Sequence, residues 1–167
     1  MCGIAGYSLQ SPASGVDLEK ALNNLSHRGP DDSGTYFNGP VALGQTRLSI
    51  IDLEGGHQPL FSADKSLVLV ANGEIYNFIE LRKDLESRGH RFLTKSDSEV
   101  VLHSYACYGD DFLRHLDGMF AFALYDKGRD RMVLARDRLG IKPLFMSENR
   151  EGVAFASEIK ALLPLMD

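Results

Sequence analysis

Residues 119–135 read MFAFALYDKGRDRMVLA, two apolar runs on either side of a polar turn. Residues 119–125 and 132–135 are rich in aromatic and aliphatic side chains that favour β-strands. The charged residues between them include Gly128, which permits a tight reversal of the chain. The stretch therefore predicts an antiparallel β-hairpin.

Further strands and helices are expected on both sides of this hairpin. Short apolar runs predict strands over residues 3–9, 41–43, 67–71 and 153–156. Helical spacing and end signals predict helices over residues 16–25, 78–88, 96–108 and 157–163. The third helix begins with a capping box formed by Ser96 and Glu99. Because strands and helices alternate in groups, we expect an α+β fold with two antiparallel sheets covered by helices.

The composition is that of an ordinary globular protein of one domain. The 167 residues are 44% hydrophobic and 25% charged, and the net charge is -5 without any run of Lys or Arg. This charge argues against nucleic acid or a membrane as a partner and favours a small-molecule substrate. No apolar stretch has the length of a membrane span, and no secretion signal is recognisable.

Cysteine usage points to a reducing compartment. Cys2 and Cys107 are the two cysteines of the chain, too few for a disulfide framework, and neither belongs to a metal-ligand spacing. We therefore expect a cytoplasmic protein without a metal site. Cys107 falls within the predicted helix over residues 96–108 and is explained by packing.

Cys2 directly follows Met1, so removal of Met1 would place a thiol on the first residue. The free α-amino group of that residue, with a pKa of about 8, could then act as the base for its own thiol. On its own, however, Cys2 is better explained as a small buried packing residue. The other candidate residues decide between these two interpretations.

Asn72 and Gly73 follow a predicted strand and support two interpretations. Asn-Gly between apolar runs is a strong hairpin signal, and without context the turn is favoured. The Asn72 side-chain amide and the Gly73 N–H could also donate to one oxyanion, each worth roughly 10²–10³-fold in rate. The two interpretations are compatible with each other.

Arg47 and Asp97 are the candidate charges of a ligand pocket. Arg47 lies in a partly apolar segment and needs an anionic partner, either an internal acid such as Asp52 or the carboxylate of a ligand. Asp97 lies at a helix start, where the helix dipole alone explains it. An amino-acid ligand would need one group of each kind.

Three other features have structural explanations. Residues 27–32, HRGPDD, are best explained as a surface turn whose charges satisfy one another. Residues 136–143 are explained as a salt-bridged strand end or as a docking surface for another domain. The remaining histidines, which show no ligand spacing and are expected to face solvent or to be structural, are His57, His90, His103 and His115.

Eight strings taken together resemble a known family. They are CGIAG from Cys2, HRGPDD from His27, RLSIID from Arg47, NGEIYN from Asn72, SDSE from Ser96, GMFAFALYD from Gly118, RDRLGIKPL from Arg136 and FASEIKALL from Phe155. In this order they resemble the glutaminase domain of the glutamine-hydrolysing asparagine synthetases, over nearly the whole chain. The resemblance implies an N-terminal-nucleophile hydrolase-like fold, a four-layer αββα sandwich over residues 1–167.

The resemblance also implies a role for each residue that matches. Cys2, freed by loss of Met1, would attack the side-chain amide of L-glutamine and form a γ-glutamyl thioester. Asn72 and Gly73 would stabilise the oxyanion, and Arg47 would hold the substrate α-carboxylate. The other implied pocket residues are Glu74 and Asp97 around the α-ammonium and the backbone of Leu48, Ser49, Ile50 and Ile51. Water would then release glutamate, and ammonia would leave for a second site.

The chain departs from the family in two respects. The family commonly has histidine at position 45, where this chain has Gln45; the position is not catalytic, so the difference bears on pocket packing. The ATP-dependent synthetase domain and its Ser-Gly-Gly-x-Asp-Ser phosphate loop are absent from this sequence. We therefore expect no cofactor in this domain, with ATP and Mg confined to a synthetase domain that accepts the ammonia. Alternatives are a domain that serves a peptide or polysaccharide acceptor, and a non-catalytic docking module.

Overall fold

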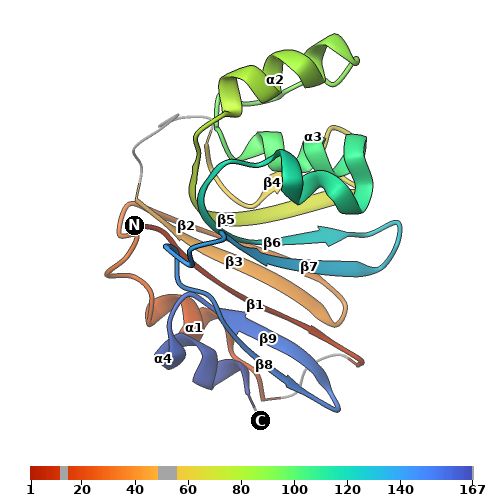
Figure 1. The fold of residues 1–167 in the computed structure, drawn as a ribbon. Helices are drawn as coiled ribbons and strands as arrows, with labels where there is room; N and C mark the ends of the chain where they lie inside the picture. Colours follow the sequence, from red (N-terminus) through yellow and green to blue (C-terminus); the bar gives the residue numbers. More distant parts are fainter. Residues whose placement is uncertain (12–14, 49–55, 167) are drawn as a thin grey trace.

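The computed structural model describes residues 1–11, 15–48 and 56–166. Within them, two antiparallel sheets lie face to face between two layers of helices, as Figure 1 shows. The five-stranded sheet has the order β2-β3-β1-β9-β8, and the four-stranded sheet has the order β4-β5-β6-β7. The expected α+β sandwich with αββα layers is therefore confirmed.

The strands of the five-stranded sheet are β1 (Gly3–Leu9), β2 (Asp32–Asn38), β3 (Val41–Arg47), β8 (Phe145–Asn149) and β9 (Gly152–Ala156). Those of the four-stranded sheet are β4 (Leu60–Phe61), β5 (Leu67–Ile75), β6 (Gly118–Asp126) and β7 (Arg131–Arg136). The helices are α1 (Leu18–Asn23), α2 (Phe78–Ser87), α3 (Glu99–Tyr108) and α4 (Ile159–Leu162), with 3-10 turns at Gly109–His115 and Leu163–Leu165.

Three apolar clusters hold these layers together. One lies between the four-stranded sheet and the helices α2 and α3, and it includes Leu69, Leu85 and Phe122. The second lies between the two sheets and includes Ile4, Leu43 and other β-strand residues. The third joins the five-stranded sheet to α1 and α4. Burial of apolar surface on both faces of each sheet fixes the strand registers, because a slip of one residue would reverse the faces.

The predicted hairpin is confirmed, with β6 and β7 paired from Ala121 opposite Arg136 to Asp126 opposite Arg131. The strand over residues 3–9 also has the predicted ends. The strands β2, β4 and β8 were not predicted. Strands β2 and β8 lie at the two edges of the five-stranded sheet and are largely exposed or half-buried, so they lack the apolar runs that indicate a strand.

The Asn-Gly pair does not form a turn. Strand β5 continues through Asn72 and Gly73 to Ile75 and pairs with β6 along its whole length. Gly73 has φ +154°, and a Cβ at this position would lie 2.1 Å from the Met119 carbonyl oxygen. Only glycine fits this close approach. Gly73 therefore lets β5 continue beside β6 at a point where a side chain would push the two strands apart.

Candidate active site

The alternation of side chains along three strands places the predicted residues in one layer. Side chains two residues apart in a strand share a face. In β1, Ile4 packs between the two sheets, so Cys2 faces the same layer. In β3, Leu43 packs there too, which directs Gln45 and Arg47 into the layer. Two neighbouring strands of the five-stranded sheet thus supply a thiol and a cation to one place.

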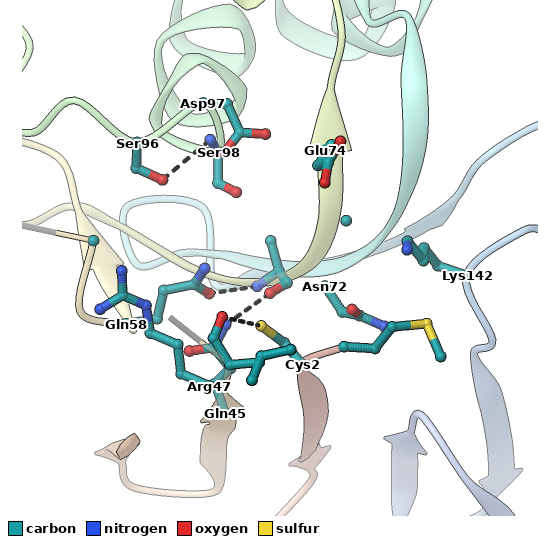
Figure 2. A pocket seen from close by; sticks show the side chains of 15 residues that line it. Cys2, Gln45, Arg47, Gln58, Asn72, Glu74, Ser96, Asp97, Ser98 and Lys142 are labelled. Carbon is teal, nitrogen blue, oxygen red and sulfur yellow. Dashed lines mark hydrogen bonds between the residues drawn. The ribbon is translucent and has the colours of Figure 1, made fainter. Parts of the chain in front are cut away.

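Strand β5 supplies the opposite wall in the same way. Val70 packs between the sheets, so Asn72 and Glu74 also face the layer. Figure 2 shows these side chains around a common space, with Asp97 above them at the start of α3. The site is therefore built between the two sheets, at the end where β1 begins.

A cavity of about 130 Å³ lies among these residues. Its lining is Met1, Cys2, Gln45, Arg47, Leu48, Gly56, Gln58, Ala71, Asn72, Gly73, Glu74, Ser96, Asp97, Ser98 and Lys142. Seven predicted site residues are thereby brought together, and the other three, Ser49 to Ile51, lie outside the described residues. Four polar residues of the lining were not among the predicted site residues: Gln58, Ser96, Ser98 and Lys142. The two serines had a signal in their position beside Asp97, and Lys142 had one in the string that begins at Arg136, whereas Gln58 had none.

Cys2 is held by residues far away in the sequence. Arg28 Nε donates to the Cys2 carbonyl oxygen at 3.0 Å, and Arg28 Nη1 lies 2.8 Å from Glu158 Oε1. His27 Nε2 lies 3.0 Å from the same Glu158 oxygen. The interpretation of residues 27–32 as a self-satisfied turn is therefore wrong, since their charges bind the C-terminal part of the chain and the backbone of Cys2.

The same turn lies tightly against β3. A Cβ on Gly29 would lie 2.4 Å from the Arg47 backbone nitrogen, so a larger residue would displace the strand at the pocket. Pro30 forms a parallel bridge with Arg47, and the Asp31 N–H donates to the Arg47 carbonyl. The turn thus fixes both Cys2 and Arg47.

The Cys2 thiol lies at the pocket, where its Sγ contacts the Leu48 carbonyl oxygen at 3.8 Å. Met1 is 59% exposed and also lines the cavity. While Met1 is present, the Cys2 nitrogen is an amide and cannot accept a proton. Removal of Met1 therefore changes both the space beside the thiol and the chemistry of that nitrogen.

Asn72 has a donor without a partner. Its side chain is buried, and within the described part of the chain its Nδ2 makes no hydrogen bond. A buried unpaired donor is unfavourable by about 1–3 kcal/mol, so native proteins rarely keep one. Because this amide faces the cavity that also holds Cys2, it is available to a ligand oxygen there.

Carboxylates occupy the α3 side of the pocket. Asp97 is 5% exposed, and its Oδ2 accepts from the Ile75 N–H at 2.8 Å. Burial raises the pKa of Asp97, and the nearby Glu74 raises it further, against the effect of hydrogen bonds from backbone N–H groups. A cation bound between Asp97 and Glu74 would relieve this repulsion. Arg47 lies on β3 of the other sheet, is 6% exposed, and provides the complementary positive charge.

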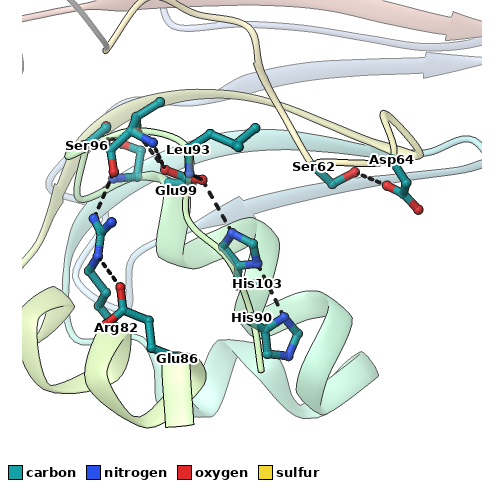
Figure 3. A network of polar contacts seen from close by, with 11 residues as sticks. Ser62, Asp64, Arg82, Glu86, His90, Leu93, Ser96, Glu99 and His103 are labelled. Carbon is teal, nitrogen blue, oxygen red and sulfur yellow. Dashed lines mark hydrogen bonds and ion pairs between the residues drawn. The ribbon is translucent and has the colours of Figure 1, made fainter. Parts of the chain in front are cut away.

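Glu99 fixes the loop that carries Asp97 (Figure 3). Its carboxylate is 1% exposed and accepts from the Leu93 N–H at 2.6 Å, from the Thr94 N–H at 2.7 Å and from the Thr94 hydroxyl at 2.6 Å. Burial by itself would raise the pKa of Glu99, but hydrogen bonds from His103, Leu93 and Thr94 outweigh burial and lower it. The loop before α3 is thus tied to the helix itself.

The capping box predicted at Ser96 does not form, because α3 begins at Glu99 and its N-cap is Ser98, whose side chain makes no capping hydrogen bond. Ser96 Oγ accepts from the Ser98 N–H at 3.3 Å in the turn before the helix. Glu99 does not return to the Ser96 N–H, which instead donates to Thr94 Oγ1 at 3.1 Å. The carboxylate is drawn away because two N–H groups and a hydroxyl converge on it from residues 93 and 94.

Residues 136–143 form a loop organised by hydrogen bonds. Asp137 accepts from the backbone N–H groups of Phe120, Leu139, Ile141 and Lys142. Arg136 donates to the carbonyl oxygens of Gly140 and Lys142. The prediction of a salt-bridged strand end is therefore wrong, since both charges serve the loop backbone. The result is a rigid loop that presents Lys142 to the pocket.

The residues set aside in the sequence have packing or surface roles. His103 packs beside His90 and Phe92, His115 stacks on Tyr108, and His57 pairs with Asp32 at the surface. Cys107 packs against the cluster under α2 and α3. No group of three potential metal ligands occurs in residues 1–11, 15–48 and 56–166. None of the helices in the same ranges is long and apolar enough to cross a membrane.

Comparison with known proteins identifies the family of the chain. A family model described as "Glutamine amidotransferase domain" matches residues 1–167. The chain belongs to this family. It is 43% identical to asparagine synthetase [glutamine-hydrolyzing] 3 of Bacillus subtilis, over 98% of this chain and 27% of that protein. It is 46% identical to asparagine synthetase B [glutamine-hydrolyzing] of Escherichia coli, over 99% of this chain and 30% of that protein.

A solved amidotransferase has the same fold. Glutamine phosphoribosylpyrophosphate amidotransferase from B. subtilis, solved with ADP and GMP, matches with a TM-score of 0.80 and 25% identity, over 98% of this chain and 43% of that one. The N-terminal-nucleophile fold expected of this glutamine amidotransferase domain is thus confirmed. The domain spans less than a third of the length of the asparagine synthetases above.

Proposed function

We propose that this domain hydrolyses L-glutamine to glutamate and ammonia and supplies the ammonia to an ATP-dependent domain of asparagine-synthetase type. The observation that carries the proposal is the unpartnered Asn72 amide in the cavity beside Cys2. A donor kept buried without a partner is suited to an oxyanion that exists only during reaction. Membership of the amidotransferase family supports glutamine as the source of that oxyanion.

The charges of the pocket fit the amino-acid end of glutamine. Arg47 would hold the α-carboxylate, and Asp97 with Glu74 would hold the α-ammonium, so that the side-chain amide points to Cys2. A ligand with a carboxylate and an ammonium on one carbon satisfies both walls at once. The backbone of residues 48–51 is proposed to complete this end of the pocket.

The reaction begins after Met1 has been removed. The Cys2 amine takes the thiol proton, and Sγ attacks the amide carbon of glutamine, whose oxygen becomes an oxyanion held by Asn72 Nδ2 and the Gly73 N–H. The C–N bond then breaks, the amine proton passes to the leaving nitrogen, and ammonia departs. A γ-glutamyl thioester remains on Cys2.

Water completes the cycle through the same groups. The amine takes a proton from the water as its oxygen attacks the thioester carbon, and the second oxyanion occupies the same two donors. The C–S bond breaks, the proton passes to the sulfur, and glutamate leaves. The hydrolysis uses a thiol, an amine and water, so we propose that this domain needs no cofactor. Two free cysteines suit a reducing cytoplasm, where we propose that it works.

The test combines mass spectrometry with glutamate release. The intact mass of the purified domain reports whether Met1 is absent, and a glutamine-analogue electrophile should add one mass increment to that form. Cys2→Ala should abolish glutamate release, and Cys107→Ala, which removes the other thiol, should keep it. A substrate panel of glutamine, asparagine and acylated amines tests the pocket. No glutamate release by Met1-free protein, with the synthetase domain supplied, would refute the proposal.

A further inference from the structure

Ala71 lies directly before Asn72 at an open edge of the four-stranded sheet. Strand β4 covers β5 only at Val68 and Leu69, and no described strand pairs with Ala71 on that side. The unpaired N–H and C=O of a buried edge would be unfavourable, so they require other partners. At this residue the partners are two glutamine side chains.

Gln58 and Gln45 each bind one backbone group of Ala71. Gln58 Oε1 accepts from the Ala71 N–H at 2.7 Å, and Gln45 Nε2 donates to the Ala71 carbonyl oxygen at 2.8 Å. Gln45 belongs to β3 of the other sheet, so its hydrogen bond crosses the layer between the sheets. Both side chains are buried, at 1% exposure for Gln45 and 7% for Gln58, and both line the cavity. Figure 2 shows both bonds.

The geometry connects this clamp to the oxyanion donors. The Ala71 carbonyl belongs to the peptide group that joins Ala71 to Asn72, so the Gln45 bond sets the plane from which the Asn72 side chain projects. Backbone groups of successive strand residues point to opposite sides, and those two apart point to the same side. The N–H of Gly73 therefore lies on the edge that the two glutamines hold.

We infer that Gln45 and Gln58 are positioning residues that aim the Asn72 amide and the Gly73 N–H at the oxyanion. The inference rests on the proposed glutamine hydrolysis. Oxyanion donors act only when they lie about 2.7–3.1 Å from the oxygen in the transition state, so a small shift of the strand matters. The substrate charges are held by other residues. Loss of the clamp should therefore lower kcat and leave the glutamine KM largely unchanged.

The experiment removes each bond while keeping side-chain size. Gln45→Met and Gln58→Met should each lower kcat about tenfold, a part of the 10²–10³-fold effect of losing a donor, with KM within about twofold. The matched control is Thr46→Val, which removes a buried hydrogen bond from Thr46 Oγ1 to the Leu25 carbonyl on the other face of β3. This control should keep kcat. Thermal melts verify that each variant is folded.

Two further measurements separate positioning from general damage. Alkylation of Cys2 by iodoacetamide forms no oxyanion, so its rate should be unchanged in both Met variants. Gln58→Glu keeps an acceptor for the Ala71 N–H and should retain kcat within about threefold. Gln45→Glu replaces the donor with a second acceptor facing the Ala71 carbonyl, so its kcat should fall as much as that of Gln45→Met. Gln45→Glu also serves as the test where Gln45→Met does not fold.

Several results would overturn the inference. They are a rise in KM at constant kcat, a parallel fall in alkylation, and an equal kcat loss in Thr46→Val. An inactive wild-type domain would instead refute the proposed function, so the two failures are distinguishable. A kcat-specific loss in both Met variants, with alkylation retained, supports the assignment.

Discussion

Arg28 Nε donates to the carbonyl oxygen of Cys2 at 3.0 Å and thereby anchors the backbone of this residue. The same guanidinium binds Glu158 Oε1 at 2.8 Å, and both side chains are mostly buried. Glu158 lies just after β9, the strand that pairs with β1. The ion pair therefore ties the position of the thiol to the C-terminal part of the domain.

Glu158→Gln should lower kcat for glutamine hydrolysis about tenfold. The amide oxygen of the variant can still accept from Arg28, but loss of the negative charge removes part of the roughly 1.5–3 kcal/mol that a hydrogen bond to a charged group is worth, so Arg28 holds the Cys2 carbonyl less firmly. The matched control is Lys160→Gln, because Lys160 Nζ contacts the other oxygen of Glu158 at 3.4 Å from an exposed position. Steady-state glutamate release checks both. Equal losses in the two variants would show that Glu158 acts through surface charge and not through Arg28.

Asn72→Leu should separate stability from activity. It removes the proposed oxyanion donor, so kcat should fall roughly 10²–10³-fold. It also removes a buried amide nitrogen that has no partner in the described part of the chain, so the free energy of unfolding should rise by about 1 kcal/mol or more. Denaturant titration and glutamate release measure the two effects. A less stable variant would indicate that the amide is satisfied in the free protein.

Much of the fold and of the site was predictable because the signals are local. The hairpin of β6 and β7, the first strand and the two long helices follow from periodicity and end signals. The pocket residues Cys2, Asn72 and Asp97 follow from matching strings, and the structure places them together. Edge strands such as β2 could not be predicted, because a strand that exposes one face to solvent carries polar residues and lacks the continuous apolar run that indicates a strand.

Other features depend on contacts between distant residues. Nothing in the local sequence of Arg28 shows that it binds the Cys2 carbonyl, or that its partner Glu158 lies 130 residues later. Gln45 likewise gives no sign that it reaches Ala71 in the other sheet. The turn expected at Gly73 was wrong because strand pairing with β6 extends past it, which a short window cannot show.

Asp97→Asn should weaken glutamine binding and stabilise the protein. Loss of one charged contact to the ammonium should raise KM by roughly one to two decades. Because burial raises the pKa of Asp97 above its ordinary 3.8, the ionised carboxyl destabilises the folded state. This penalty is absent below pH 3.8 and develops as the pH rises through the raised pKa. The melting temperature of Asp97→Asn should therefore exceed that of the wild type, and by more at pH 7.5 than at pH 4.

Two outcomes would contradict the Asp97 prediction. An unchanged KM would remove the carboxylate from the substrate site. A variant less stable than wild type at pH 7.5 would show that the hydrogen bond from the Ile75 N–H outweighs the burial of the charge. Arg47→Ala provides the companion measurement, since it removes the opposite charge and should raise KM by a similar factor.

Glu99→Gln should loosen the loop that carries Asp97 and should do so in a pH-dependent way. At pH 7 an amide cannot accept all three donors from residues 93 and 94, so the free energy of unfolding should fall by about 1.5–3 kcal/mol and KM should rise. Hydrogen bonds lower the pKa of Glu99 below its ordinary 4.5. Its stabilisation is therefore full above pH 4.5 and is lost as the pH falls through the lowered pKa.

Acid titration of unfolding distinguishes this role from a surface effect. The difference in the free energy of unfolding between wild type and Glu99→Gln should narrow as the pH falls below 4.5, because the wild-type carboxyl then becomes protonated. The matched control is Glu86→Gln, since Glu86 makes an exposed i,i+4 pair with Arg82 at 3.0 Å that is worth only about 0.3–0.5 kcal/mol. Glu86→Gln should leave KM unchanged, although Arg82 also donates to the Thr94 carbonyl. If both variants raise KM equally, the loop is held by Arg82, and Glu99 is not what positions Asp97.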